Sequence, residues 1–199
     1  MVGVFWRLVG VKIETKKLIY HSLVESHFNY GIMVWCSELA NNLTTETENI
    51  KGLNHIPKSL KTIESNLKKI IRAIFQKPKY NKKTKEYTET APLYKKLKVL
   101  KLQDLYYFNL ALLVHDYFYN PSLPIAIRNK FDEIIIIKQN KTRSEGLNIA
   151  YKLPKNKLSC KKPTIAGSSY WNRIPIEIRK IESKSIFKVK LKEMMINKY

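Results

Sequence analysis

Glycine, cysteine and acidic residues are scarce in this chain of 199 residues, which has six glycines, two cysteines and 16 Asp and Glu against 37 Lys and Arg. It contains no Gly-x-Gly-x-x-Gly, no Walker sequence and no Gly-x-Ser-x-Gly, so the common phosphate loops and the nucleophile elbow are excluded. Cys36 and Cys160 lie far apart, without a Cys/His cluster around either one. A disulfide scaffold or a zinc knuckle is therefore not expected. We interpret Cys36 as a buried thiol, with a reactive nucleophile as the alternative.

Long apolar runs are also absent. Residues 1–11 are apolar, but Trp6 and Arg7 interrupt them and no small-residue cleavage site follows. This segment is too short for a membrane span and poor as a signal peptide. We expect an intracellular protein with no membrane partner, and its 44% hydrophobic and 11% aromatic residues are typical of a packed globular chain.

Paired carboxylates of the kind a polymerase needs are missing as well. Catalysis by two metal ions requires at least two acids that converge on one point, and this chain has no Asp-Asp. The nearest imitation is Phe131-Asp132-Glu133, which we interpret as a solvated helix end. The four histidines are not at metal-ligand spacing, and His27 is expected to be a core histidine. The sequence predicts no catalytic residue, no metal site and no cofactor.

Positive charge is abundant and unevenly spread. Residues 51–110 carry 15 Lys and Arg against 4 Asp and Glu, and residues 130–199 carry 17 against 6. Such concentration favours a polyanionic partner, most simply nucleic acid. The alternative is an A/T-rich codon composition without selection for binding, since Lys outnumbers Arg 31 to 6.

The clearest local pattern is a basic amphipathic helix over 57–76. Its apolar stripe comprises Leu60, Ile63, Leu67, Ile70, Ile71 and Ile74. A cationic face and the basic stretch that follows form the predicted nucleic-acid-binding set: Lys58, Lys61, Lys68, Lys69, Arg72, Lys79, Tyr80, Lys82 and Lys83. Lysines would follow a phosphate backbone without reading sequence, and Tyr80 and Tyr87 would stack on unpaired bases. An ordinary solvated helix face is the alternative.

Other periodicities predict further helices. Over 16–35 the expected buried face comprises Tyr20, Leu23, Val24, His27, Gly31 and Val34. Residues 101–119 are apolar on nearly every side, which predicts a central buried helix. Thr90 and Pro92 are typical of a helix start, and a short basic helix should run from Pro124 to Phe131.

The C-terminal third is less regular in pattern. Residues 134–137 are four isoleucines and the best strand candidate, with a buried helical turn as the alternative. We expect 138–168 to be mostly loop, with one short strand near 149–153. Two helices should close the chain, one over 175–181 and one over 184–197.

Six blocks, in order along the chain, carry a resemblance to a known family. They are Leu18 to Gly31 followed by Val34-Trp35, Leu67 to Ile74, Thr90 to Leu93, Leu97 to Leu105, Thr142-Arg143, and Tyr170 to Pro175 followed by Phe187-Lys188. This series resembles the C-terminal part of reverse transcriptases of non-LTR retrotransposons of the jockey type. The chain departs from the family at Cys36-Ser37, where glycine is more common.

The resemblance implies the thumb and the extension beyond it, which grip template and nascent strand, and it makes the nucleus a possible location. It implies that the catalytic palm of the RNA-directed DNA polymerase lies upstream of this chain. It also marks a structural motif of seven residues, namely Tyr30, Gly31, Trp35, Trp171, Asn172, Pro175 and Phe187. For Tyr170 and Trp171 we favour core packing over direct stacking on nucleic acid.

We therefore expect a mainly α fold: a helical thumb-like bundle with a small C-terminal extension that is α with minor β. The expected segments are a post-palm helix region (1–36), a polar loop or insertion (37–56), a thumb-like core (57–130) and a basic extension (131–199). The predicted function is that of a reverse-transcriptase fragment without its palm. Such a fragment is no enzyme alone and retains non-specific nucleic-acid binding. The alternative is a structural or interaction module.

Overall fold

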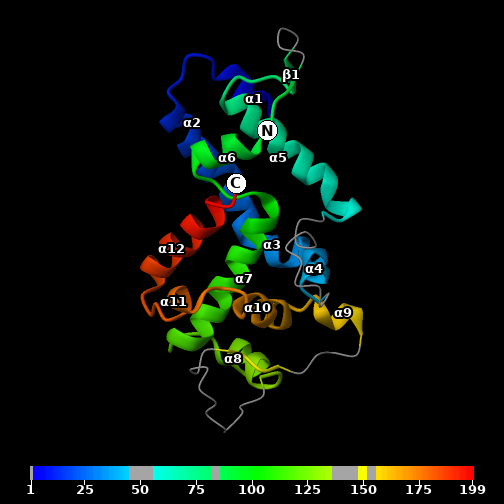
Figure 1. Ribbon diagram of the computed structural model, residues 1–199, viewed down its shortest axis with the longest axis vertical. Helices are drawn as coiled ribbons and strands as arrows, with labels where there is room; N and C mark the ends of the chain where they lie inside the picture. The colour runs from blue at the N-terminus through cyan, green and yellow to red at the C-terminus, as the bar shows by residue number, and fades with distance from the viewer. Residues whose placement is uncertain (1, 45–55, 82–85, 136–147, 152–155) are drawn as a thin grey trace. The chain divides into compact units, whose positions relative to one another are not determined.

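The computed structural model describes residues 2–44, 56–81, 86–135, 148–151 and 156–199, and it confirms a mainly α-helical fold (Figure 1). The α-helices are α1 (Val2–Arg7), α2 (Ile13–Tyr20), α3 (Ser26–Trp35), α4 (Asn41–Thr44), α5 (Lys61–Ile74), α6 (Ala91–Leu97), α7 (Leu102–Tyr119), α8 (Ile125–Asp132), α9 (Lys157–Cys160), α10 (Pro163–Trp171), α11 (Ile176–Arg179) and α12 (Lys184–Ile196). The other helical turns are a π-helix, η1 (His21–Glu25), and two 3-10 helices, η2 (Ser37–Ala40) and η4 (Lys58–Leu60). Among the described residues, no helix has the length and apolar character that crossing a membrane requires.

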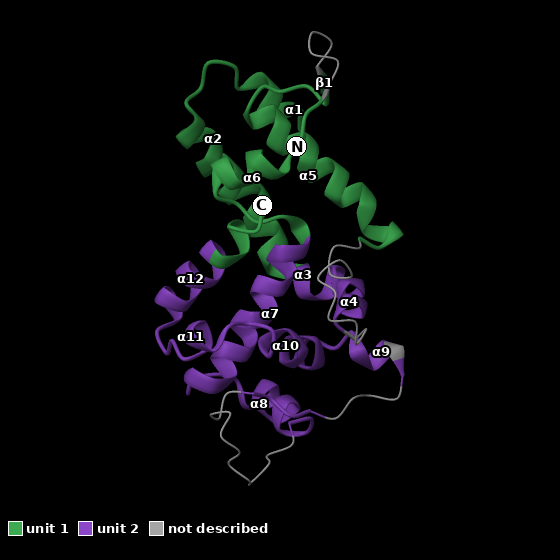
Figure 2. Ribbon diagram, in the orientation of Figure 1, with its two compact units in different colours: residues 1–31, 56–102, 194–199 green, residues 32–55, 103–193 purple. Residues whose placement is uncertain are grey.

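The chain divides into two compact units that are interleaved along the sequence (Figure 2). Unit 1 comprises residues 1–31, 56–102 and 194–199, and unit 2 comprises residues 32–55 and 103–193. Each unit therefore draws on distant parts of the chain, whereas the sequence patterns suggest consecutive segments.

Helix α5 organises unit 1. It contacts α1, α2 and α6 through the stripe expected from the sequence, in which Leu67, Ile71 and Ile74 are buried. Phe5 of α1 and Tyr94 of α6 are also buried. Because the stripe follows the 3.6-residue period, the opposite face of α5 is left to solvent.

Two polar side chains bind the C-terminal end of α5. The Lys16 ammonium of α2 donates to the carbonyl of Ile74 over 3.3 Å, and it is buried. Gln76 ends the helix in the left-handed region at φ 54°, and its amide donates to the carbonyls of Ala73 (3.0 Å) and Phe5 (3.4 Å). Helix C-termini leave carbonyls without intrahelical partners, so these two side chains tie α1 and α2 to the end of α5.

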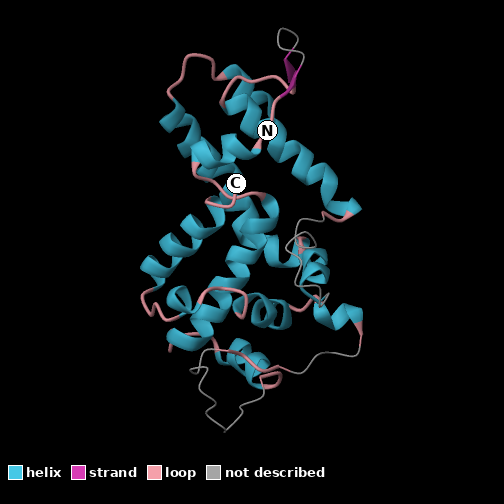
Figure 3. Cartoon of the chain, viewed as in Figure 1, coloured by secondary structure: helices cyan, strands magenta, loops and turns pink. Residues whose placement is uncertain are grey.

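Beyond α5 the chain forms a short hairpin that the sequence patterns did not predict (Figure 3). Strand β1 (Tyr80–Asn81) pairs antiparallel with β2 (Glu86–Tyr87), with Tyr80 opposite Tyr87. Residues 77–88 are expected to be irregular because Pro78 and Asn81 are breakers. Pro78 instead precedes the strand, and the tyrosines favour extended backbone.

The helix expected over 16–35 contains a π-helical segment, η1, that shifts its buried face. At the end of η1, the Ser26 N–H donates to the carbonyl of His21, five residues back. The buried positions consequently advance in steps of four or eight residues, from Lys16 to Tyr20, Val24 and Ile32. A π turn holds one residue more than an α turn, so each later position rotates relative to the 3.6-residue pattern.

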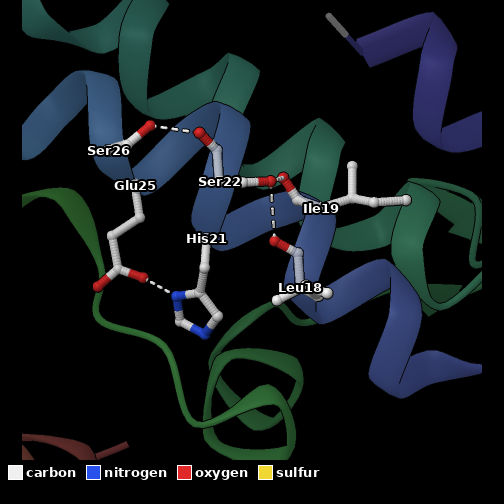
Figure 4. A network of polar contacts seen from close by, with 6 residues as sticks. All are labelled: Leu18, Ile19, His21, Ser22, Glu25 and Ser26. Atoms are coloured by element: carbon white, nitrogen blue, oxygen red, sulfur yellow. Dashed lines mark hydrogen bonds and ion pairs between the residues drawn. The ribbon is translucent and has the colours of Figure 1, made fainter.

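This rotation corrects the face predicted from the sequence. Leu23 and Val34, expected in the core, are 45% and 72% exposed, and His27 is exposed too. The core histidine is instead His115. Figure 4 shows the polar contacts at the turn: His21 pairs with Glu25, and Ser22 donates to the carbonyls of Leu18 (3.0 Å) and Ile19 (3.2 Å).

Helices α7 and α10 pack closely in unit 2. From Gln103 onward, buried positions of α7 include Tyr106, Leu110 and Val114, as expected of a helix that is apolar on most sides. Residues 165–171 of α10 are all buried. A Cβ on Gly167 would lie 2.9 Å from Cγ2 of Val114, so the absence of a side chain permits this approach.

Helix α10 corrects the end of the stretch 138–168, which the sequence predicts to be mostly loop, whereas residues 138–147 and 152–155 of that stretch lie outside the described residues. Pro163 occupies the first turn of the helix, where its missing N–H costs nothing. Ala166, Gly167, Ser168 and Ser169 supply no large apolar stripe, so the periodicity search misses a helix whose small residues are buried. Four-residue α9 is a second helix within this stretch.

Two other expectations are partly corrected. Residues 37–44, expected to be a polar loop, form η2 and α4, with Leu39 and Leu43 buried. They are held because Ser169 and Arg173 donate to the carbonyl of Leu43. Of the isoleucines expected to form a strand, Ile135 makes an isolated bridge with Tyr151, and Ile136 and Ile137 lie outside the described residues. Residues 45–55, which are expected to continue the polar loop, also lie outside the described residues.

An aromatic cluster surrounds His115 in unit 2. The His115 ring stacks on Phe187 with centroids 4.4 Å apart, and Trp171 lies 5.8 Å from Phe187. Nε2 of His115 donates to the carbonyl of Ile181 (2.8 Å), whereas its Nδ1 is buried with no hydrogen-bond partner among the described residues. Burial lowers the pKa of His115, and this outweighs the opposite effects of the Ile181 carbonyl and Asp116; Lys184 lowers it further.

The two helical glycines Gly3 and Gly167 provide a matched test of the α7–α10 contact. Gly167→Ala should lower the free energy of unfolding by about 1–3 kcal/mol, because the new methyl group meets a β-branched side chain in a packed core. Gly3→Ala should instead raise it by roughly 0.5 kcal/mol, since nothing lies within 4 Å of a Cβ there and alanine is the better helix former. Urea denaturation followed by circular dichroism measures both changes. Equal effects of the two substitutions would contradict the close approach of α7 and α10.

Stability should fall on acidification because of His115. Its folded pKa lies below the unfolded value of 6.5, so the unfolded chain binds the proton more readily. The free energy of unfolding should therefore decrease as the pH falls from about 7.5 to about 5.5. His115→Phe keeps an aromatic ring and removes the titration, so its curve should be flatter over this interval. Parallel curves for the two proteins would refute the assignment, whatever their offset.

Candidate nucleic-acid interface

The outward face of η4 and α5 carries most of the predicted binding residues. Lys58, Lys61 and Lys69 are exposed, and Lys68 and Arg72 are half-buried. Their spacing puts all five on the side opposite Leu67, Ile71 and Ile74. We call the side chains of Lys58, Lys61, Lys68, Lys69 and Arg72 the α5 cationic face.

One acid lies within this face. Glu64 is paired with Lys68 over 2.6 Å at the i, i+4 spacing, so part of the charge of Lys68 is already neutralised. Lys69 lies 3.5 Å from the amide oxygen of Asn66, at the outer limit for a hydrogen bond. Lys58 and Lys61 extend into solvent. Their charge is the most accessible to a polyanion.

Arg72 combines charge with partial burial near the C-terminal end of α5. Its Nε is buried and has no hydrogen-bond partner in the part of the chain that the structure describes. The neighbouring Tyr94 hydroxyl has a pKa raised by burial, and the positive charge of Arg72 acts in the opposite direction. The guanidinium has one edge toward the core, so it is more fixed in position than the lysines.

The hairpin continues the cationic surface past the end of α5. The Lys77 N–H donates to the carbonyl of Arg72 (2.9 Å), which closes the helix. Lys77, Lys79 and Tyr80 are exposed. The hairpin is fastened at its base, where the Thr88 N–H donates to the carbonyl of Lys79 (2.9 Å) and its hydroxyl to that of Pro78 (2.7 Å). From Lys58 to Lys79 the sequence has seven cations and one acid. Lys82 and Lys83, also predicted to bind, lie outside the described residues.

The seven residues of the structural motif lie in two different environments. Trp171 and Phe187 are fully buried, Tyr170 stacks on Tyr107 at 4.8 Å, and Pro175 precedes α11. Asn172 exchanges two 2.9 Å hydrogen bonds with the backbone of Ile149. These are packing arrangements, and they leave no ring face of Trp171 to a base.

The other part of the motif is on the surface. Tyr30 is 90% exposed and Trp35 is exposed, with Gly31 between them half-buried. The buried face predicted from the sequence includes Gly31 but neither Tyr30 nor Trp35. The structure therefore buries Trp171 and Phe187 of the motif and leaves Tyr30 and Trp35 at the surface.

The second basic block shows more pairing than α5. On α12, Lys184 pairs with Asp116 (2.6 Å) and Lys190 with Glu193 (3.6 Å), and Lys188 is exposed. Four lysines of 130–199 precede α9 and lie outside the described residues, namely Lys138, Lys141, Lys152 and Lys155. The described part of this block therefore offers less free charge on one element than the α5 cationic face.

Groups suited to catalysis do not converge in the described ranges. No group of three or more His, Cys, Asp or Glu side chains there is placed to hold a metal ion. Asp132 accepts a hydrogen bond from Tyr117 (2.7 Å), and Glu133 pairs with Lys130 (2.9 Å), as befits a solvated helix end. Burial raises the pKa of the Cys36 thiol to about 11, which disfavours the reactive thiolate.

Sequence reasoning missed two features of this interface. The Glu64–Lys68 pair has a visible signal, since acid and base stand four residues apart with the acid first. The Tyr80–Tyr87 pairing has only a weak signal in the sequence, because the intervening residues include no Asn-Gly or Asp-Gly turn.

Comparison with known proteins gives no match to any family model, to any curated protein sequence or to any solved structure.

Proposed function

We propose that this chain binds nucleic acid non-specifically through the α5 cationic face and the adjoining base of the hairpin. The observation that carries the proposal is that the segment from Lys58 to Lys79 has seven cations and one acid, and that five of these cations lie on η4 and α5, opposite the buried face of α5. Lysine dominates this surface, and an ammonium group contacts phosphate as a point charge without recognising a base. Affinity is therefore expected to depend on salt and to vary little with sequence.

We propose further that the chain corresponds to the thumb and post-thumb region of a non-LTR retrotransposon reverse transcriptase. Support comes from the six ordered sequence blocks together with the helical fold. The Thr90–Leu93 block begins α6, and the Trp171-Asn172 pair ends α10, so both blocks mark helix boundaries. In this proposal the chain holds template and primer for a catalytic palm that it does not itself contain.

The competing function is a structural or interaction module. Its supporting observation is the ratio of 31 lysines to 6 arginines, which codon composition alone would produce. The two functions differ in whether the effect of removing a lysine depends on where that lysine lies. In the module, removing charge from α5 and removing it elsewhere should be equivalent.

Replacing Lys61 and Lys69 with glutamine should weaken binding and reduce its salt dependence. Each lost phosphate contact lowers the slope of log affinity against log salt by about 1, so the double variant should lose about 2. Fluorescence anisotropy with duplex and single-stranded oligonucleotides, from about 50 mM salt upward, measures the slope.

The matched control replaces Lys188 and Lys198, two exposed lysines on or next to α12, and removes the same charge. Its slope should stay within about half a unit of the unaltered protein. No binding by the unaltered protein at about 50 mM salt, or the same loss in both double variants, would contradict the proposed interface.

The chain alone should not extend a primer. Polymerase chemistry requires converging carboxylates for two metal ions, and the sequence has no Asp-Asp. Incubation with a primed RNA template, deoxynucleotides and Mg²⁺ or Mn²⁺ should leave the primer unchanged on a denaturing gel. Metal-dependent incorporation by purified protein that persists after removal of contaminating polymerase would refute this expectation.

A further inference from the structure

The hairpin carries an aromatic pair that its own stability does not explain. Each strand has two described residues, and an isolated two-stranded hairpin is at best marginally stable in water. A cross-strand tyrosine pair adds only weakly to the stability of such a hairpin. Nevertheless the hairpin presents two large rings to solvent, with Tyr80 41% and Tyr87 71% exposed.

The geometry of the pair leaves ring faces open. The two ring centroids lie 5.2 Å apart and the planes are inclined by 59°, so the rings do not stack face to face. Each partner lies on at most one side of the other ring. Each ring therefore has a second face that its partner tyrosine does not cover. The exposure of Tyr87 indicates that described protein atoms cover little of that face.

Positive charge exceeds negative charge in the sequence around the pair, where residues 77–89 contain five lysines against Glu86 and Glu89. Lys77 and Lys79 are exposed immediately before Tyr80, and Lys77 is hydrogen-bonded through its backbone to the last turns of α5. A phosphate backbone that follows the α5 cationic face is thus led toward the two rings. Aromatic rings beside a cationic groove are the combination by which proteins hold unpaired bases without sequence preference.

On the basis of the proposed nucleic-acid binding, we infer that Tyr80 and Tyr87 form a stacking site for unpaired bases, so that the preferred ligand is a single strand. In a duplex each base is covered above and below by its neighbours and offers no face to a tyrosine. The lysines act on both forms through phosphate. The tyrosines therefore add affinity for the single strand alone.

The test separates stacking from charge with two probes of about 12 nucleotides, a length within the usual range of single-strand sites. One probe is oligothymidylate, and the other is an abasic strand with the same phosphates. The full chain should bind oligothymidylate about tenfold more tightly than the abasic strand, the scale of one base–aromatic contact. Equal affinities would overturn the stacking site and leave the phosphate-binding face intact. No binding to either strand would overturn both.

Substitutions at Tyr87 assign the preference to this residue. Tyr87→Leu should reduce the discrimination, since Tyr80 alone remains to stack, while leaving the abasic affinity and its salt slope unchanged, because no charge is altered. Tyr87→Phe is the control, since it keeps the ring and should keep the discrimination. A Leu variant that still prefers oligothymidylate as strongly as the unaltered protein would refute the assignment. Circular dichroism verifies that the fold of each variant is unchanged.

Discussion

The need to bury a helix that is apolar around its circumference governs the core of unit 2. No single partner covers such a helix, so α7 is enclosed by several short elements, each with a few large side chains or none. Phe187 and Trp171 fill one region around His115. At Gly167, α10 approaches α7 closely because this residue has no side chain. The motif residues Trp171, Asn172 and Phe187 are explained by this enclosure without reference to a ligand.

In unit 1 the buried residues and the cationic residues of α5 lie on opposite faces of one helix. The apolar side of α5 and the contacts of Lys16 and Gln76 at its end hold the unit together. Lys58, Lys61 and Lys69 make little contact with protein, and surface charges of this kind contribute little to stability. Their substitution can therefore change the surface charge while the fold is retained. The same separation allows charge to accumulate there through codon composition without harm, which is why its position must be tested.

Sequence alone predicts the helices that have a large apolar stripe, and for a physical reason. In α5 and α12 the burial signal is carried by Leu, Ile, Phe and Met at helical spacing. Helix α10 is not predicted because its burial depends on small residues and on a neighbour that is distant in sequence. The π turn is not predicted because the periodicity assumes 3.6 residues per turn. One added residue moves Leu23 and Val34 to the surface. The cationic face was predictable from spacing. The pairing of Tyr80 with Tyr87 was not, because it depends on how two strands align.

The burial of Lys16 makes it an internal reporter of local opening. Lys16 of α2 is 5% exposed and its ammonium donates to the carbonyl of Ile74 at the end of α5, whereas Lys61 of α5 is open to solvent. An amine-reactive label modifies an exposed lysine at once but reaches Lys16 only when α2 separates from α5. The labelling rate of Lys16 thus measures how often α2 separates from α5. A polyanion bound along α5 would protect Lys61 by covering it, and it would protect Lys16 by making that separation rarer.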